Sequence, residues 1–554
     1  MNKKVCSFPI LFALLTLLIG TCAVVFPASA QAAPTSTGSI TVSGTVASSY
    51  DAYQIFSADV VDGDSDAKTA TDLAWASDAV RDAVLPVLHS AGMLNSQTTA
   101  QEAAEWLNSD SHLTSALSAQ LARSLQGSDA KSVVLNAGTA AELPCGYWFI
   151  VADDDAIAQG EAGTAPIMAL VGGSAVTVKP KAATPKVAKH VLEDGTAAWQ
   201  KAADATVADD LYWRLSATVP AGLTAYDTYT VWFVDTMSAG LDPSKVAASM
   251  RVYVAAGADG GFDAVPTGKD GRAGTEPAKG WTDITAQCGV SVDGKTFTVR
   301  TGDLIAALGG VDAFTAGARV VAVYNAPLNS ACNHGIAKGN PNEVYLRYPR
   351  SPFADQSGDA GFTRTPSDDA CAYTWDLALT KRGSDGDKPL AGAVLSIADD
   401  RGRTLAADGT WDAEGKATVT TGEDGRVTVS GVDSGKLEVR EIKAPKGYTA
   451  FEGTRSVTVK AEGLDVDQVA AAKPKLTIAA ESPLRADSAD GSTGSLEASL
   501  INTPTGTPPS ITTGGFMPST GDMAMYAAAA AAVAGAALIV VALLVKRGGG
   551  SHKE

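Results

Sequence analysis

The chain is poor in the residues on which enzymes and nucleic-acid-binding proteins most often depend. It has 5 histidines and 6 cysteines among 554 residues, aromatic residues make up 6%, and Asp and Glu outnumber Lys and Arg by 61 to 43. The formal net charge of −18 argues against nucleic acid as a partner, because a polyanion is repelled by an acidic surface. We therefore look for a function that needs neither a basic surface nor a histidine-based site.

Motifs for metal binding and for nucleophilic catalysis are missing as well. The four histidines that precede the C-terminal tail have no metal-site spacing such as His-Glu-x-x-His, and no nucleophile motif is found. Asp62, Asp64 and Asp66 imitate the start of a calcium loop, but the Gly and Glu that such a loop requires later do not follow. We interpret these aspartates as a solvated turn. The sequence thus predicts no metal, no cofactor and no enzyme.

The N-terminus has the composition of a secretory signal peptide. Lys3 and Lys4 precede an apolar run over residues 8–26, and Ala28-Ser29-Ala30 supplies small residues for cleavage. The sequence therefore predicts export, with residues 1–30 removed.

The C-terminus predicts a membrane anchor. Residues 523–545 carry no charge and are long enough to span a bilayer, and Lys546-Arg547 would stay on the cytoplasmic side. A Thr/Pro/Gly-rich linker over 506–516 and the motif Met517-Pro-Ser-Thr-Gly521 come before the span. The chain is thus expected to be exported at one end and held at the other.

The exported part is predicted to be mainly β, with tandem immunoglobulin-like β-sandwich domains. Short β-branched runs such as Val176-Thr-Val178 alternate with Gly/Asp turns such as 422–425. Some helix is expected in the first domain, where Thr99 and Glu102 have capping-box spacing ahead of a periodic apolar stretch. We place the boundaries at 31–180, 181–355 and 373–505, before the linker 506–516 and a terminal unit over 517–554.

Four cysteines lie in the exported part, where disulfides are permitted: Cys145, Cys288, Cys332 and Cys371. Sequence alone cannot choose among the three full pairings. We favour a Cys332–Cys371 disulfide and leave the other two cysteines open, with four buried thiols as the alternative.

The C-terminal motif resembles the cell-wall sorting signal of Gram-positive surface proteins, Leu-Pro-x-Thr-Gly, with Met517 in place of Leu. The resemblance implies that a sortase cleaves between Thr520 and Gly521 and transfers the threonyl group to an amine. It also implies class C and housekeeping sortases and peptidoglycan as partners, and a location on the cell wall.

Two internal segments resemble domains that form Lys–Asn isopeptide bonds. Leu437-Glu-Val-Arg-Glu441-Ile-Lys-Ala-Pro-Lys-Gly-Tyr448 is similar to the E-box of collagen-adhesin B-type domains, which implies that Lys381 joins Asn502 beside Glu441. The stretches 183–191, 229–237 and 339–348 resemble a fimbrial isopeptide-forming middle domain. That resemblance implies a second triad of Lys189, Asp235 and Asn342. Asn340 stays open as the alternative to Asn342.

Val176-Thr-Val-Lys-Pro-Lys181 resembles the pilin motif, whose lysine receives the threonyl group of the next subunit. Lys181 is the expected acceptor, although Lys179 and Lys186 stay open.

Together these motifs resemble a sortase-assembled major pilin, the shaft subunit of a Gram-positive surface pilus. This implies other copies of the chain as partners and a host or bacterial surface receptor. A monomeric wall-anchored adhesin is the alternative function.

The chemistry implied by the resemblance requires burial. An exposed lysine is protonated and does not attack, whereas burial disfavours its charge and lowers its pKa. The neutral amine can then attack a carboxamide held in contact, and a neighbouring carboxyl group moves the protons as ammonia leaves. We therefore expect Asp235 and Glu441 to act once each, on their own chain.

Overall fold

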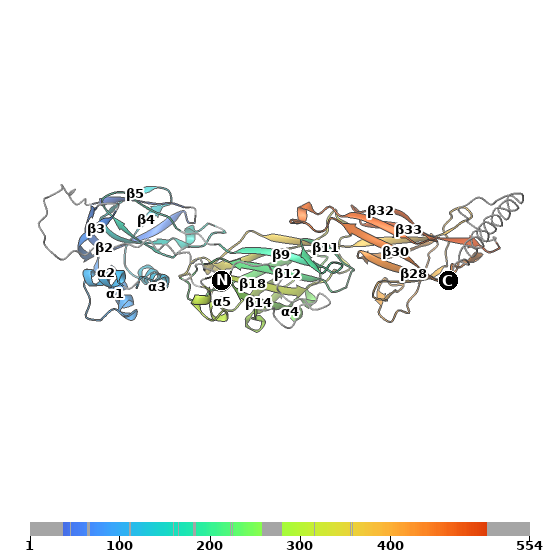
Figure 1. The fold of residues 1–554 in the computed structure, drawn as a ribbon, viewed down its shortest axis with the longest axis horizontal. Coiled ribbons are helices and arrows are strands. Elements are labelled where there is room, and N and C mark those ends of the chain that lie inside the picture. Colours follow the sequence, from blue (N-terminus) through green and yellow to red (C-terminus); the bar gives the residue numbers. More distant parts are fainter. Residues whose placement is uncertain are drawn as a thin grey trace, which may run out of the picture.

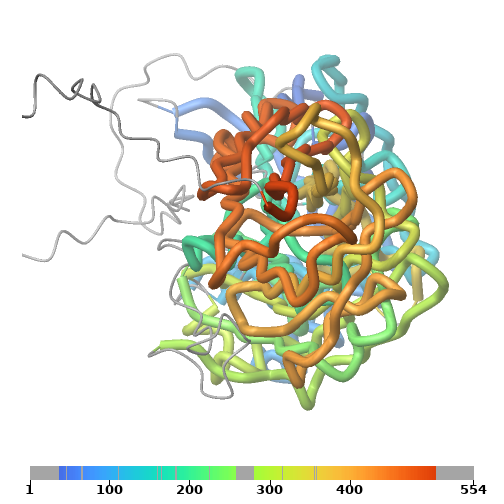
Figure 2. The backbone as a smooth tube through the Cα atoms, turned by 90° about the vertical axis from the view of Figure 1, so that its right-hand side faces the viewer, coloured from blue at the N-terminus to red at the C-terminus, as the bar shows by residue number. Residues whose placement is uncertain are grey.

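The computed structural model describes residues 37–506, apart from 45, 64–66, 110–111, 159, 164, 181–183, 222, 224, 258–279, 315, 355 and 357. Three β-rich domains follow one another along a single long axis (Figure 1), and they overlap when viewed along that axis (Figure 2). Within the described residues, no helix is long and apolar enough to cross a membrane. The predicted signal peptide, Lys181, Thr520, Gly521 and the span 523–545 lie outside the described residues.

The first domain packs two sheets on each other and three helices on the larger sheet. The smaller sheet has the order β5-β1-β8, and the larger has the order β3-β2-β6-β7 with β4 also paired to β2. Helix α2 begins with the predicted capping box of Thr99 and Glu102. The elements are β1 (Thr37–Val42), β2 (Ser49–Asp62), β3 (Lys68–Trp75), α1 (Asp78–Ser90), α2 (Ala100–Asn108), α3 (Ser115–Gln126), β4 (Ser132–Asn136), β5 (Ala140–Pro144), β6 (Gly146–Ala152), β7 (Ile167–Val171) and β8 (Val176–Val178).

The middle domain is a sandwich of two larger sheets. One has the order β10-β9-β12-β18-β14-β15, and the other β11-β21-β19-β13-β17-β16 with β20 paired to β19. The elements are β9 (Lys186–Glu193), β10 (Ala198–Gln200), β11 (Ala202–Asp204), β12 (Tyr212–Val219), β13 (Trp232–Met237), α4 (Val246–Ser249), β14 (Arg251–Ala256), β15 (Thr282–Asp283), β16 (Gly289–Asp293), β17 (Thr296–Arg300), α5 (Leu304–Ala307), α6 (Val311–Phe314), β18 (Ala318–Asn325), β19 (Asn340–Pro349), β20 (Phe362–Arg364) and β21 (Asp368–Tyr373).

The third domain is again a two-sheet sandwich. Its first sheet has the order β27-β22-β33-β29 with β32 paired to β33, and its second has the order β25-β24-β23-β28-β30-β31 with β26 paired to β23. The elements are β22 (Trp375–Gly383), β23 (Val394–Ala398), β24 (Thr404–Leu405), β25 (Trp411–Asp412), β26 (Val419–Thr420), β27 (Arg426–Val432), β28 (Gly435–Lys443), β29 (Tyr448–Thr449), β30 (Thr454–Glu462), β31 (Lys475–Ala480), β32 (Leu484–Asp490) and β33 (Ser495–Pro504).

Strand β21 belongs to two hydrophobic cores. Ala370 and Ala372 lie in the core of the middle domain, whereas Cys371 and Tyr373 lie in the core of the third. Alternate side chains of a strand point to opposite faces, so one strand can serve both cores. The middle sheet therefore continues beyond residue 355, where the sequence places its end, and only Thr374 separates β21 from β22. The two domains are joined along one nearly continuous extended segment.

Candidate cross-linking sites

The three polar residues predicted in the third domain each occupy a core-facing position of a strand. In β22, Leu377 and Leu379 point into the sandwich, and Lys381 is the next residue on that face. The same alternation places Glu441 after Val439 on β28 and Asn502 after Leu500 on β33. Because β22 and β33 run parallel with Lys381 opposite Leu500, the first and last strands of the domain lie side by side. The alternation of side chains along each strand therefore points the lysine, the glutamate and the asparagine into the core of the sandwich.

Lys381, Glu441 and Asn502 form a closed hydrogen-bonded triangle. The Nζ atom of Lys381 lies 2.9 Å from Oε1 of Glu441 and donates to Oδ1 of Asn502. Nδ2 of Asn502 donates to Oε1 and Oε2 of Glu441 at 2.9 and 3.1 Å. The lysine and glutamate side chains are 0% exposed. Amine, amide and acid therefore meet with water excluded.

Burial changes the acid–base behaviour of Lys381. Loss of solvation lowers its pKa to about 8, against the opposing attraction of Glu441. The ring of Phe451 lies 5.8 Å from Nζ, and the Phe451 backbone N–H donates to Oε2 of Glu441 at 3.1 Å. Phe451 thus packs its ring beside the lysine amine and holds the Glu441 carboxylate with its backbone N–H. At neutral pH a larger fraction of this amine is uncharged than in an exposed lysine, and the uncharged form is able to act as a nucleophile.

The middle domain assembles a second buried group by the same alternation. Lys189 points to the same side of β9 as Val191, and Asp235 points to the same side of β13 as Phe233. Both polar side chains are 0% exposed. Nζ of Lys189 donates to Oδ2 of Asp235. Burial lowers the pKa of Lys189 to about 8 and raises the pKa of Asp235. The pair is therefore displaced toward its uncharged forms.

The structure separates the two asparagines that the sequence leaves as alternatives. Asn342 is fully buried, and its Nδ2 donates at 2.8 Å to the hydroxyl of Tyr324, which also contacts Lys189. Asn340 is bonded to backbone instead: its Nδ2 donates to the carbonyls of Asn333 and Ala372, and its Oδ1 accepts from the Asn333 N–H at 2.8 Å. Asn342 is thus the amide at the Lys189 cluster, and Asn340 fixes a loop.

Sequence reasoning missed Tyr324, which lies on β18. Its side chain is 0% exposed and its hydroxyl contacts every member of the middle cluster. It also missed Lys201, whose Nζ donates to the Lys189 carbonyl at 2.8 Å and to Asp368, while Asp368 accepts from the Lys189 N–H at 2.6 Å. The only mark of Tyr324 in the sequence is its position at the end of the apolar run of β18. Tyrosine is common in strands, so this position alone does not indicate a functional residue.

The favoured Cys332–Cys371 disulfide is wrong in this structure, where both residues are free thiols. Cys332 Sγ faces the His334 ring at 3.5 Å, and Cys371 Sγ contacts the Ala372 carbonyl at 3.7 Å. Cys371 alternates into the core of the third domain, whereas Cys332 is half-buried in the loop before β19. Each sulfur atom therefore contacts a different neighbour, and the two sulfur atoms are not bonded to each other.

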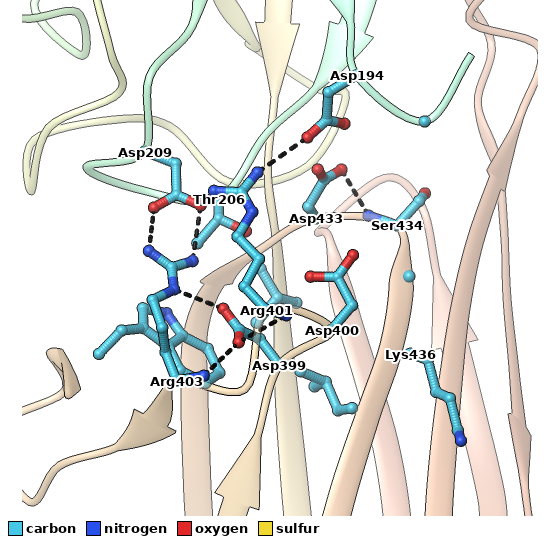
Figure 3. Close-up of a pocket in the computed structure, with 15 residues that line it drawn as sticks. Asp194, Thr206, Asp209, Asp399, Asp400, Arg401, Arg403, Asp433, Ser434 and Lys436 are labelled. Carbon is cyan, nitrogen blue, oxygen red and sulfur yellow. Dashed lines mark hydrogen bonds and ion pairs between the residues drawn. The ribbon is translucent and has the colours of Figure 1, made fainter. Parts of the chain in front are cut away.

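A charged junction joins the middle and third domains (Figure 3). Arg403 of the third domain holds Asp209 of the middle domain through two contacts of 2.5 and 2.7 Å. Arg401 contacts the same carboxylate at 2.7 Å and reaches Asp194 at 3.2 Å. A bidentate pair of this kind fixes orientation as well as distance.

Three carboxyl groups meet beside this junction. Glu193 and Asp204 of the middle domain and Asp433 of the third have oxygen atoms within 4.8 Å of one another. Burial and the neighbouring carboxylates raise the pKa of Glu193 to about 8, and raise the pKa of Asp433 as well. These shifts favour the protonated, uncharged forms, and this is the one group of three such carboxyl residues within metal-binding distance among the described residues.

Comparison with known proteins gives a consistent picture. Residues 376–473 match the family model of the SpaA prealbumin-like fold domain. A segment of 143 residues is 29% identical to the trypsin-resistant surface T6 protein of Streptococcus pyogenes serotype M6, covering 24% of each chain. The chain thus aligns with about a quarter of the length of that curated relative.

Solved pilin structures resemble the chain over most of its length. The T6 backbone pilin of serotype M6 Streptococcus pyogenes covers 85% of this chain and 98% of its own, with 16% identity and a TM-score of 0.47. The major pilin SpaD from Corynebacterium diphtheriae covers 84% and 98%, with 15% identity and a TM-score of 0.41. The prealbumin-like match and the alignment with the T6 surface protein agree with the resemblance that the sequence predicts. The names of these proteins describe a surface protein and two pilins.

Proposed function

We propose that the chain is a structural subunit of a covalently polymerised surface pilus, strengthened inside each subunit by Lys–Asn isopeptide bonds. The observation that carries the internal part is the buried triangle of Lys381, Glu441 and Asn502. The observations that support a pilus subunit are the prealbumin-like match over 376–473 and the similarity to the T6 surface protein. The arrangement of three domains along one axis suits a shaft (Figure 1).

The proposed reaction in the third domain needs only the three side chains. The uncharged Nζ of Lys381 attacks Cγ of Asn502, whose oxygen it already contacts. Glu441 accepts a proton from the attacking nitrogen and gives a proton to Nδ2, to which it is bonded at 2.9 Å. Ammonia leaves and an amide remains, so the atoms balance without water or an external reagent.

The mechanical consequence follows from strand order. Lys381 and Asn502 lie on the first and last strands of the third domain, 121 residues apart. A bond between them passes tension from one end strand to the other without loading the strands between. By analogy with a disulfide that closes a loop of this size, it would stabilise the domain by about 5 kcal/mol.

The polymer bond would join Thr520 of one subunit to Lys181 of the next, and both residues lie outside the described part of the chain. Lys181 falls between β8, the last strand of the first domain, and β9, the first strand of the middle domain. The sorting-signal and pilin motifs support this assignment. Sortases, peptidoglycan anchoring and a role in adhesion belong to the same proposal.

Intact mass of the chain over residues 31–520 tests the internal bonds. Each isopeptide bond removes the mass of one ammonia molecule, so two are missing from the wild type. Glu441→Ala should restore the mass of one. A wild-type chain at its full sequence mass would overturn the proposal for both domains.

Wall extracts test the polymer bond. The proposal predicts a ladder of bands that survives boiling in detergent and collapses to one band in Lys181→Ala. Lys179→Ala and Lys186→Ala are the matched controls and should keep the ladder. A single band from the wild type would favour a monomeric wall-anchored adhesin.

A further inference from the structure

The hydroxyl of Tyr324 sits at the centre of the middle-domain cluster. It lies 3.0 Å from Nζ of Lys189 and 3.1 Å from Oδ2 of Asp235, and it accepts from Nδ2 of Asn342 at 2.8 Å. A phenol has one hydrogen to donate and lone pairs with which to accept. Donation to Asp235 and acceptance from Lys189 and Asn342 therefore use its capacity fully.

The two proposed cross-linking sites differ in how acid and amide are connected. In the third domain, both oxygens of Glu441 accept directly from Nδ2 of Asn502. In the middle domain, Asp235 contacts Asn342 only through Tyr324, since Oδ1 of Asp235 has no hydrogen-bond partner in the described structure. Aspartate is one methylene shorter than glutamate. The Tyr324 hydroxyl therefore bridges Asp235 and Asn342, whereas Glu441 contacts Asn502 directly in the third domain.

The surroundings hold this hydroxyl in position. Tyr324 comes from β18, which pairs with β12 next to the Lys189 strand β9, and its ring packs edge-on against Phe297 with centroids 4.7 Å apart. Burial and the neighbouring Asp235 raise the pKa of Tyr324 well above its ordinary value. The hydroxyl therefore keeps its proton at neutral pH and is available as a donor.

We propose that Tyr324 is a second catalytic group of the middle domain beside Asp235, relaying a proton between Asp235 and the amide nitrogen that leaves Asn342. This inference rests on the proposed function of the Lys189–Asn342 pair. As the uncharged Nζ of Lys189 bonds to Cγ of Asn342, protonated Asp235 gives its proton to the Tyr324 oxygen while that oxygen gives its own to Nδ2. Asp235 then takes the surplus proton from the newly bonded nitrogen of Lys189. The Cγ–Nδ2 bond then breaks, ammonia leaves, and Tyr324 and Asp235 end as they began.

The test follows bond formation in the chain over residues 31–520, made by cell-free synthesis and sampled over time. Peptide mass spectrometry measures the Lys189–Asn342 and Lys381–Asn502 branched peptides in the same sample. Tyr324→Phe should slow the first bond about 100-fold, the usual scale for a lost acid–base group, and leave the second at the wild-type rate. Tyr226→Phe is the matched control: it removes another buried hydroxyl, one without a hydrogen-bond partner in the described structure, and should change neither rate.

Fluorotyrosine at position 324 separates proton relay from packing. Its ring keeps the shape of tyrosine while its hydroxyl is more acidic, so the first bond should form faster. A Tyr324→Phe chain that closes this bond at the wild-type rate overturns the inference, as does an unaltered rate with fluorotyrosine. In either case a normal wild-type bond leaves the proposed function standing. A wild type that never forms the bond overturns both.

Discussion

At the scale of the residue, the unusual feature is a polar side chain placed in a row of core positions. Lys381, Glu441 and Asn502 each extend an apolar alternation, and each is buried. An isolated buried charge would cost several kcal/mol, and removing one partner would leave the others unsatisfied. A covalent bond between amine and amide removes the charge permanently. We infer that these sites are tolerated in the core because the reaction neutralises them.

Glu441→Gln tests the role of the acid. The variant should keep the shape of the side chain but lose the proton acceptor, so Lys381 and Asn502 should stay unlinked. Thermal or denaturant unfolding should then show a third domain less stable by about 5 kcal/mol, the value expected for a closed loop of this length. Glu438→Gln, at an exposed position of the same strand, is the control and should retain both bond and stability.

The pH dependence of an unlinked chain tests the buried amine. In Asn502→Ala, Lys381 stays a titrating amine with a folded pKa of about 8, below its unfolded value. Between these two pKa values the unfolded chain binds the extra proton, so stability should rise as pH rises from about 8 to about 10.5. The gain should be on the order of 3 kcal/mol. The linked wild type has no such amine, so a similar rise in the wild type would contradict the account.

At the scale of the element, the sequence predicts most of what depends on alternation. The strands around β12, β18, β22 and β33 and the capping box of α2 are where the pattern places them. Helix α1 escapes prediction although Ser77 caps it and Val80, Val84 and Leu88 form its buried face, because Pro86 within the helix disguises the pattern. Its burial against the larger sheet outweighs the unfavourable residue.

The candidate sites divide in the same way. The lysines, acids and asparagines are found in sequence because they interrupt apolar rows within segments that resemble known motifs. Tyr324 and the junction arginines carry no such mark, since tyrosine is normal in a strand and arginine is normal in a turn. Their roles depend on strands distant in sequence, which the chain does not reveal until it folds.

Two loops of neighbouring domains meet through a pair of glycines. Gly335 of the middle domain and Gly494, in the turn between β32 and β33, both have a φ of +74°, and a Cβ on either would lie 2.5 Å from the backbone nitrogen of the other. Gly494→Ala should therefore force the loops apart and destabilise the junction by roughly 1–3 kcal/mol. Limited proteolysis should cut the junction faster. Gly409→Ala, at a similar φ with open space around it, isolates the backbone strain and should leave the junction intact.

At the scale of the whole molecule, the middle and third domains are coupled more closely than their separate cores suggest. They share β21, the Arg401 and Arg403 contacts, and the glycine pair. A shaft subunit under tension benefits from such coupling, because a bend between domains would concentrate force on the connecting segment. We expect these two domains to move as one body.

Arg403→Ala should loosen that body. The substitution removes the bidentate hold on Asp209, so small-angle X-ray scattering should report a broader distribution of maximum dimensions. Added salt should give the wild type part of the same change by screening the ion pairs. Arg485→Ala removes a pair with Asp487 inside the third domain and should leave the distribution as it was. An identical distribution for Arg403→Ala would show that the Arg403–Asp209 pair does not hold the two domains together.

The junction should also respond to pH through Glu193. Its folded pKa of about 8 lies above its unfolded value, so the folded chain binds the extra proton between about pH 4.5 and 8. Stability of the junction should therefore fall as pH rises through this window. Glu193→Gln should flatten the dependence in pH-resolved proteolysis, and a steeper fall in the variant would contradict the assignment.

The central claim is that buried amines become amide bonds inside each subunit, and peptide mass spectrometry of tryptic digests tests it most directly. The account predicts a branched peptide in which Lys381 is joined to Asn502 with the loss of one ammonia, and a second that joins Lys189 to Asn342. Unbranched peptides carrying a free Lys381 and an intact Asn502, recovered in full yield from the folded wild-type chain, would contradict it.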